Sequence, residues 1–441
     1  MNMKLSNILS FVTLLSTTLI FTSCADEQEI NPTNVKDNNS ALFYNENEIC
    51  NLASDARTAF FGVDSRSNIT IANIYPVRKS HEGRSKENDL LYVVNFDENK
   101  GFAVVSADKT HNSIYAITDC GNLSLENNDN PGLQDYLDRA VVYANNLIDT
   151  GNIAVKPPHL YYLDIITDTI YHSVIKPVVK VQWGQDYPYN TQINLSQFGN
   201  KKPKAGCVAI AAAQALTYFE YPLSIKRQTE DCKGQTLTLD WSKIKKHIRC
   251  DNPTGKYESY CTKNITEHNM ISALIFEIGS RINTLYGLNL STAHISNLIP
   301  VLTEFGYNVT DFTPYGSGRL ALTEGSVLIM GSFNKDDSGV GHAYIIDGKN
   351  FYKFNITKNI YDMGPGGSAI TPKLISSEQY TEQANYVHIN WGLNGLANGY
   401  YYDKVFDTEQ IYQYDSDATK ITNDNKHFSY SSNISFIKIT R

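Results

Sequence analysis

The chain has 441 residues, of which 41% are hydrophobic and 19% charged, which suits a globular protein with more than one domain. Its formal net charge of −8 leaves no basic stripe to neutralise phosphates, so nucleic acid is excluded from the expected partners.

The N-terminal segment is predicted to be a targeting signal. An apolar run over residues 8–21 is short for a membrane span and is typical of a signal peptide covering residues 1–23. Small residues followed by Cys24 are typical of a bacterial lipoprotein signal, in which the lipidated thiol anchors the protein to the outer or cell membrane. The alternative is an ordinary signal peptide with an incidental cysteine. Residues 24–45 are polar and acidic and predict a tether.

Residues 46–176 are predicted to form a small α+β domain. Apolar spacing indicates a helix over 46–61 and an amphipathic helix over 132–148. "LLYVVNF" and "FAVVSAD", joined by "DENKG", predict a hairpin, and "SIYAIT" predicts a third strand. The following stretch, "VKPPHLYYLDIITDTIYHSVIKPVVK", is interpreted as an extended linker and a candidate processing region.

Residues 177–441 are predicted to form a second, two-lobed α+β domain. A helix begins at Cys207, a polar stretch follows over 226–269, and further helices are indicated by the apolar spacing over 271–285 and 295–308. The pattern then changes to strands, namely "SVLIMGSF", "HAYIIDG", "FYKFNI", "YVHINWG", "GYYYDKVF" and "SNISFIKIT".

A single cysteine stands at the start of the helix predicted in "PKAGCVAIAAAQALTYF". A helix N-terminus presents unpaired N–H groups and a partial positive charge, which favour the thiolate of Cys207. Gly206 allows substrate and backbone to approach closely. These features point to a nucleophile, and the alternative is a buried structural cysteine.

A nucleophilic cysteine needs a base, and two of the ten histidines have distinctive surroundings. His342 lies beside a glycine at the start of a predicted strand, 135 residues after Cys207, and His388 lies in "YVHINWG". The spacing favours His342, because papain-like enzymes place this histidine about 130–150 residues after the cysteine. Asn390 can accept from the imidazole N–H, and Trp391 can shield that bond from water.

The developing oxyanion also needs hydrogen-bond donors. The Cys207 N–H is one candidate, and Gln185 in "WGQDYPYN" supplies a side-chain amide upstream. The chemistry requires no metal or cofactor, and the seven cysteines include no CxxC spacing typical of zinc sites. Two of Cys232, Cys250 and Cys261 are close enough in sequence to form a disulfide, with the pairing left open.

Four segments resemble the streptopain family of papain-fold cysteine peptidases. They are "GQDYPYN", "AGCVAIAAAQALTYFEYP", "GHAYIIDG" and "VHINWGLNG". The resemblance implies a papain-like fold in which Cys207 is the nucleophile, His342 the base, Gln185 the oxyanion donor, and Asn390 with Trp391 the support of the histidine. Leu393 and Asn394 depart from the family pattern, which puts substrate preference in question more than catalysis.

The resemblance also implies that the front domain is an inhibitory prodomain and that "IKPVVK" is its junction with the mature enzyme. We therefore expect an exported cysteine endopeptidase made as a zymogen, with protein or peptide substrates and its own prodomain as partners. The alternative is a surface adhesin or peptide-binding protein that uses a peptidase-like scaffold without catalysis.

Overall fold

The structure, a computed structural model, describes residues 43–62, 70–77, 89–125, 130–150, 159–250, 265–312, 321–333, 341–365, 371–406 and 434–441. Contacts divide the chain into two compact units. Unit 1 comprises Met1–Leu123, Ala140–Ser173 and Phe351–Asn385, and unit 2 comprises Ser124–Arg139, Val174–Asn350 and Tyr386–Arg441. The units interleave along the chain, whereas the predicted domains are each continuous.

Unit 1 contains the predicted helix over 46–61, the predicted hairpin and the second half of the helix predicted over 132–148. Helix α1 (Glu46–Phe61) starts with a reciprocal cap, in which Asn45 and Glu48 each accept the other's main-chain N–H, at 3.0 and 2.8 Å. Four antiparallel strands follow, and α1 packs on the last two of them. These strands are β1 (Ile71–Pro76), β2 (Leu91–Phe96), β3 (Phe102–Ser106) and β4 (Ile114–Thr118).

Helix α2 (Pro131–Thr150) matches the helix predicted over 132–148, and it passes from unit 2 into unit 1 at Ala140. The Asn130 side chain caps its first turn by accepting the N–H of Leu133 at 3.0 Å. Farther along the helix, within unit 1, Tyr143 packs edge-on against Tyr115 of β4.

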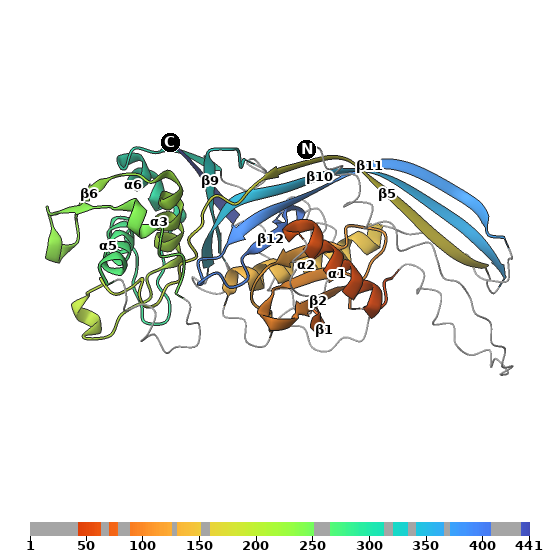
Figure 1. Cartoon of the computed structure of the whole chain (residues 1–441), viewed down its shortest axis with the longest axis horizontal. Coiled ribbons are helices and arrows are strands. Elements are labelled where there is room, and N and C mark those ends of the chain that lie inside the picture. Colours follow the sequence, from red (N-terminus) through yellow and green to blue (C-terminus); the bar gives the residue numbers. More distant parts are fainter. Residues whose placement is uncertain are drawn as a thin grey trace, which may run out of the picture. The chain divides into compact units, whose positions relative to one another are not determined.

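Three long strands complete unit 1 (Figure 1). Part of the predicted linker is strand β5 (His159–Ile175), which pairs with β10 (Gly341–Pro365), and β10 neighbours β11 (Lys373–Asn390). Sequence reasoning predicted shorter strands because it read the glycine and polar residues after Ile346 as a break. The alternating aromatic and β-branched residues of β5 have strand propensity, but the pairing partner is distant in sequence.

Unit 2 combines helices with an antiparallel sheet. Its main helices are α3 (Cys207–Phe219), α5 (Ile265–Arg281) and α6 (Leu298–Glu304), the last preceded by the 3-10 turn Ile295–Asn297. Strand β13 (Ile434–Thr440) pairs with both β8 (Asn308–Phe312) and β9 (Ser326–Phe333), and β12 (Gly399–Tyr402) pairs with the end of β11. These elements confirm the predicted order of helices followed by strands.

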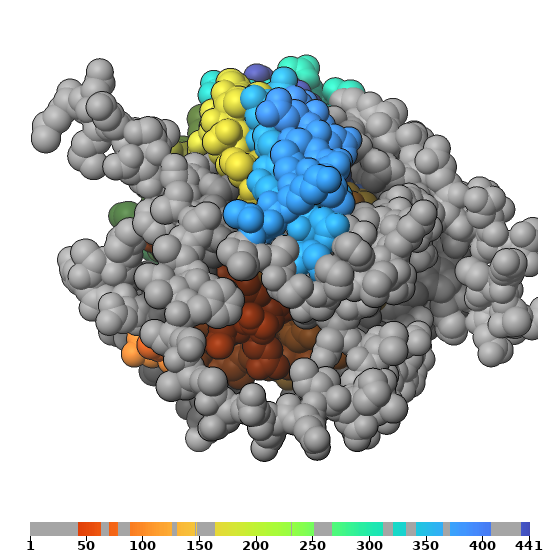
Figure 2. All heavy atoms as spheres, turned by 90° about the vertical axis from the view of Figure 1, so that its right-hand side faces the viewer, coloured from red at the N-terminus to blue at the C-terminus, as the bar shows by residue number. Residues whose placement is uncertain are grey.

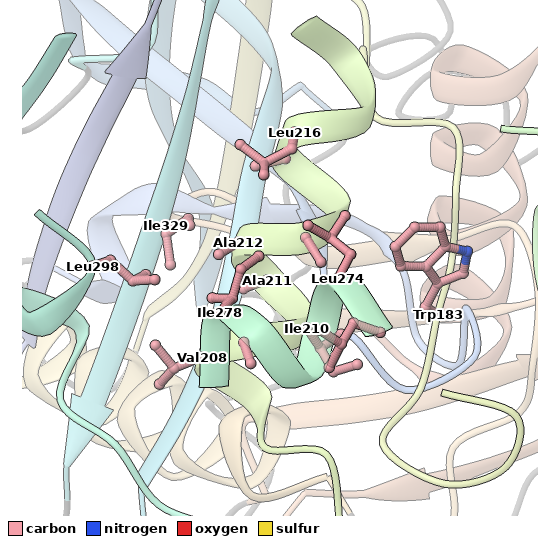
Figure 3. Close-up of a cluster of buried hydrophobic side chains, with 14 of the residues drawn as sticks. Trp183, Val208, Ile210, Ala211, Ala212, Leu216, Leu274, Ile278, Leu298 and Ile329 are labelled. Carbon is pink, nitrogen blue, oxygen red and sulfur yellow. The ribbon is translucent and has the colours of Figure 1, made fainter. Parts of the chain in front are cut away.

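Helix α3 is the centre of the unit 2 core. All residues from Cys207 to Thr217 are buried, as expected for a helix that is apolar on every side. Its alanines let α5 approach closely, and Figure 3 shows Leu274 and Ile278 of α5 beside the α3 side chains, with Ile329 of β9 near by. This packing fixes the helix that begins with the candidate nucleophile.

The polar stretch predicted over 226–269 is anchored to α5 by one buried carboxylate. Glu277 is fully buried and accepts from Arg227 Nε at 3.0 Å, from Thr229 Oγ1 at 2.6 Å and from the Gln228 N–H at 2.8 Å. A short hairpin of β6 (Ser224–Lys226) and β7 (Thr236–Thr238) leads to α4 (Trp241–Ile244).

Two of the three cysteines considered for a disulfide, Cys232 and Cys250, are free thiols, and Cys261 lies outside the described residues. Cys24 and the predicted signal peptide also lie outside them. Within the described ranges, no helix is long and apolar enough to cross a membrane. The same ranges contain no cluster of three or more histidine, cysteine or acidic side chains able to hold a metal ion.

Candidate active site

Cys207 is the first residue of α3, and Gly206 before it has a φ of 90°, a left-handed conformation that favours glycine. The thiol is 9% exposed. Burial raises the pKa of Cys207, and hydrogen bonds from the main-chain N–H groups of Ala343, Val208 and Cys207 itself oppose that shift. The helix start therefore stabilises a thiolate, but burial outweighs it in this conformation and keeps the thiol protonated.

His342 is the second residue of β10 and is 4% exposed. Its Nε2 lies 2.7 Å from the Trp391 carbonyl oxygen, so this nitrogen carries the proton and donates it. Burial lowers the pKa of His342 to about 4, with the Trp391 carbonyl acting in the opposite direction, so the ring is neutral at pH 7.

The imidazole of His342 is thus turned toward Trp391, and among the described residues it makes no hydrogen bond to Cys207. The residue directly after His342, Ala343, nevertheless lies in the same buried cluster as Cys207. The indole of Trp391 and the ring of Tyr344 flank the histidine, with ring centroids 6.4 and 6.2 Å away.

The start of α2 lies directly against this histidine. An added Cβ at Gly132 would stand 2.9 Å from His342 Cδ2 and 2.7 Å from Trp391 Cζ3, which is too close for any other residue without a shift. Tyr136, one turn later, is fully buried and stacks edge-on against Tyr401 at 5.0 Å. A segment of the front domain therefore belongs to unit 2 and contacts the candidate base.

Trp391 is fully buried and held on three sides. Its main-chain N–H donates to Asn398 Oδ1 at 3.0 Å, and its indole N–H donates to the Ala397 carbonyl and the Tyr401 hydroxyl, at 3.0 and 3.1 Å. These three hydrogen bonds position Trp391, and with it the carbonyl that accepts from His342. Asn398 and Tyr401 were not identified from the sequence, since neither stands at a spacing that marks a site.

Asn390 is bound to the backbone rather than to His342. Its Nδ2 donates to the Val181 carbonyl at 2.8 Å and to Gln214 Oε1 at 3.3 Å, while its Oδ1 accepts the Gly392 N–H at 3.1 Å. Contact between Asn390 and the imidazole, as predicted, is not present in this conformation and stays a prediction for one in which the histidine has turned.

Gln185 is placed beside the nucleophile loop by its own backbone. Its carbonyl accepts the N–H of Ala205 at 2.8 Å, two residues before Cys207, and the neighbouring Asp186 forms an ion pair of 2.7 Å with Lys204. The segment leading to it is held by side chains. Gln214 Oε1 accepts the Trp183 N–H at 2.7 Å, and Asp347 Oδ2 accepts the Val179 N–H at 2.7 Å.

The second candidate histidine lies in a different place. His388 Nδ1 is 2.6 Å from Asp347 Oδ1, so this pair supports the segment at Val179 and His388 is not bonded to Cys207. Gln214 was missed by sequence reasoning, although a signal exists. It is the one strongly polar side chain in the apolar helix, and it lies seven residues, or two turns, after Cys207.

Two family models match the sequence of this chain. The model of the Peptidase C10 family matches residues 183–401, and the model described as Spi protease inhibitor matches residues 51–142. The chain belongs to the C10 peptidase family. It is a streptopain-like cysteine peptidase that carries an inhibitor prodomain, which makes it a peptidase zymogen.

Streptopain from Streptococcus pyogenes serotype M1 is 21% identical over 363 residues, covering 73% of this chain and 76% of streptopain. Among solved structures, a cysteine-to-alanine fragment of prointerpain A from Prevotella intermedia covers 80% of this chain and 96% of its own, with 22% identity and a TM-score of 0.47. Active interpain A from the same organism covers 60% and 94%, with 21% identity and a TM-score of 0.35.

Proposed function

We propose that this C10 peptidase cleaves protein substrates through Cys207 and His342, with the Cys207 N–H and Gln185 as oxyanion donors. The observation that carries the proposal is that Cys207, at the start of α3, and Ala343, directly after His342, lie in one buried cluster. The Gln185 carbonyl is bonded to Ala205, in the loop that leads to Cys207.

In the proposed reaction, His342 takes the proton of the Cys207 thiol, and the thiolate attacks the substrate carbonyl carbon. The oxyanion forms where the Cys207 N–H and the Gln185 amide can donate. The intermediate collapses to a thioester as His342 gives its proton to the leaving amine. Water then attacks the thioester with His342 as base, which releases the acid and restores the thiol.

The described conformation is interpreted as the latched precursor. His342 Nε2 is bound to the Trp391 carbonyl, no hydrogen bond joins the imidazole to Cys207 among the described residues, and the start of α2 occupies the space against its ring. In this proposal the prodomain inhibits by holding the base away from the nucleophile. The alternative mode is filling of the substrate cleft.

We further propose that the zymogen is exported and anchored through lipidated Cys24, with release of the catalytic domain after processing. This proposal is supported by the apolar run over residues 8–21 and the polar segment that follows Cys24. An anchored peptidase needs inhibition during export, which the prodomain provides.

The test uses casein hydrolysis under reducing conditions and covalent labelling by a thiol-directed epoxide, on the full chain and after processing. We expect hydrolysis and labelling only after processing, and neither in a Cys207→Ala protein. A processed protein that binds peptides but neither hydrolyses casein nor reacts with the epoxide would favour the adhesin alternative.

A further inference from the structure

Residues Phe351–Asn385, here called the arm, fold with the inhibitor although they belong to the peptidase part of the chain. They lie in sequence between His342 and Asn390, yet they group with residues 1–123 and 140–173 in unit 1. Figure 1 shows β10 and β11 extending beside β5, and in Figure 2 the β5 atoms adjoin those of β10 and β11 in one block.

The arm contacts β5 through the main chain and through side chains. Strand β5, 17 residues long, pairs with β10. His172 stacks on Tyr352 with ring centroids 4.3 Å apart and an interplanar angle of 11°, and Tyr171 packs against Phe351 at 6.0 Å. Farther along the arm, Asn359 Nδ2 lies 3.3 Å from Asp164 Oδ2.

Tyr352 also contacts a second element of the inhibitor. Its ring is 6.1 Å from that of Phe60 in α1, and the side chain is only 5% exposed. In contrast, the first nine residues of β11, from Lys373 to Thr381, are all exposed. Tyr352 is therefore a buried contact between the arm and the inhibitor.

Cleavage in the predicted junction would leave all of these contacts intact. The junction begins at Ile175, the last residue of β5, so a cut there breaks one peptide bond and removes no ring contact or strand pair. We propose that the arm is a retention surface that keeps the cleaved inhibitor bound through β5 and α1. The proposal rests on the proposed zymogen function. It implies that processing cuts one peptide bond and that the inhibitor is released in a later, separate step.

The inhibitor is also attached at a second place, through Tyr136, and this attachment is separate from the arm. Tyr136 in the first half of α2 stacks on Tyr401 and Phe406, and its hydroxyl accepts the Tyr402 N–H at 3.1 Å. This attachment serves the latch at His342. We expect loss of Tyr136 to weaken the latch and loss of Tyr352 to weaken retention.

The test uses the full-length Cys207→Ala protein with a C-terminal affinity tag. A recognition sequence for a site-specific endopeptidase is inserted between Lys176 and Pro177, so that nicking does not depend on the chain's own activity. After cutting, we expect the inhibitor fragment to elute with the tagged fragment in equal amounts. Tyr136→Ala should still co-elute, whereas adding Tyr352→Ala should speed dissociation at least about tenfold, because it removes a buried aromatic ring.

Tyr380→Ala is the matched control, because it removes an aromatic side chain from the exposed part of the arm. Each uncut variant must still unfold in one cooperative thermal transition, with a lower midpoint expected for Tyr352→Ala. Separation of the fragments immediately after cutting would overturn the proposal, as would equal dissociation rates for Tyr352→Ala and Tyr380→Ala. Retention without casein hydrolysis by the processed wild-type chain would instead contradict the proposed function and leave the retention surface standing.

Discussion

Gln214 Oε1 accepts the main-chain N–H of Trp183 at 2.7 Å, which joins the nucleophile helix to the segment that carries Gln185. The same oxygen accepts from Asn390 at 3.3 Å, directly before the tryptophan whose carbonyl holds His342. The buried side chain of Gln214 thus connects the nucleophile helix both to the segment that carries Gln185 and to Asn390.

Gln214→Met should leave the Trp183 N–H buried without an acceptor and lower kcat/KM by about tenfold to a hundredfold. Because we expect the loss to act through Gln185, the Gln214→Met/Gln185→Ala double variant should lose little more than Gln185→Ala alone. Thr217→Val is the control, since the Thr217 hydroxyl bonds only within its own helix. Additive losses in the double variant would contradict this coupling.

Replacing the proposed catalytic residues should give graded losses of casein hydrolysis. Cys207→Ala should abolish it, a loss of at least about ten-thousandfold, and His342→Ala should be nearly as severe. Asn390→Ala should be milder, about fivefold to a hundredfold, because it leaves the Val181 carbonyl unpaired but removes no reacting group. Turnover retained by Cys207→Ala would exclude it as the nucleophile.

Gly132→Ala should weaken the latch in the unprocessed chain. The added Cβ would contact the rings of His342 and Trp391 at 2.9 and 2.7 Å, so the start of α2 must move away. We expect epoxide labelling of Cys207 in the full-length protein to rise at least about tenfold over the parent. Gln134→Ala, on the same turn but partly exposed, should leave labelling unchanged. Equal labelling of all three proteins would argue against a latch at this helix start.

Acidification should destabilise the latched precursor. The pKa of His342 is lowered by burial to about 4, so between pH 6.5 and 4 the unfolded chain binds a proton there that the folded chain does not. This contribution to the free energy of unfolding is complete above pH 6.5 and falls by about 2 kcal/mol by pH 5. Urea unfolding of Cys207→Ala with and without His342→Gln measures it, and equal losses in both proteins would contradict a buried neutral histidine.

Membrane association should depend on Cys24. We expect the wild-type chain to fractionate with the cell envelope and a Cys24→Ser variant to be released, because the serine cannot carry the lipid. If the variant stays with the envelope as the wild type does, another means of attachment replaces lipidation, and if neither protein fractionates with the envelope, the ordinary-signal alternative holds.

Local patterns predicted the helices and short strands well. The alanine-rich run after Cys207 is helical because its residues favour helix and bury on every side, and the capped helix at Glu46 follows from Asn45 and Glu48. The length of β5 was not predictable in this way, since its partner β10 is almost two hundred residues away and no local signal marks the pair.

The sequence motifs predict which residues form the site but not how their side chains are turned. The pairing of Cys207 with His342 stays a prediction, because the structure bonds His342 to the Trp391 carbonyl. His342 is turned onto the Trp391 carbonyl and lies against Gly132, a residue that is distant in sequence and outside the motif. The partners of Asn390 could not be predicted from the sequence either, because tertiary packing brings Val181 and Gln214 to its side chain.

The hydrogen bond from the Val179 N–H to the buried carboxylate of Asp347 limits how far proteolysis can shorten the N-terminus of the mature peptidase. Val179 is buried, whereas Lys176 three residues earlier is exposed. A protease needs an extended, accessible backbone, so trimming from the N-terminal side should stall before Val179. We therefore expect the bond to Asp347 to set the N-terminus of the mature chain. This N-terminus should be the same whichever enzyme makes the first cut.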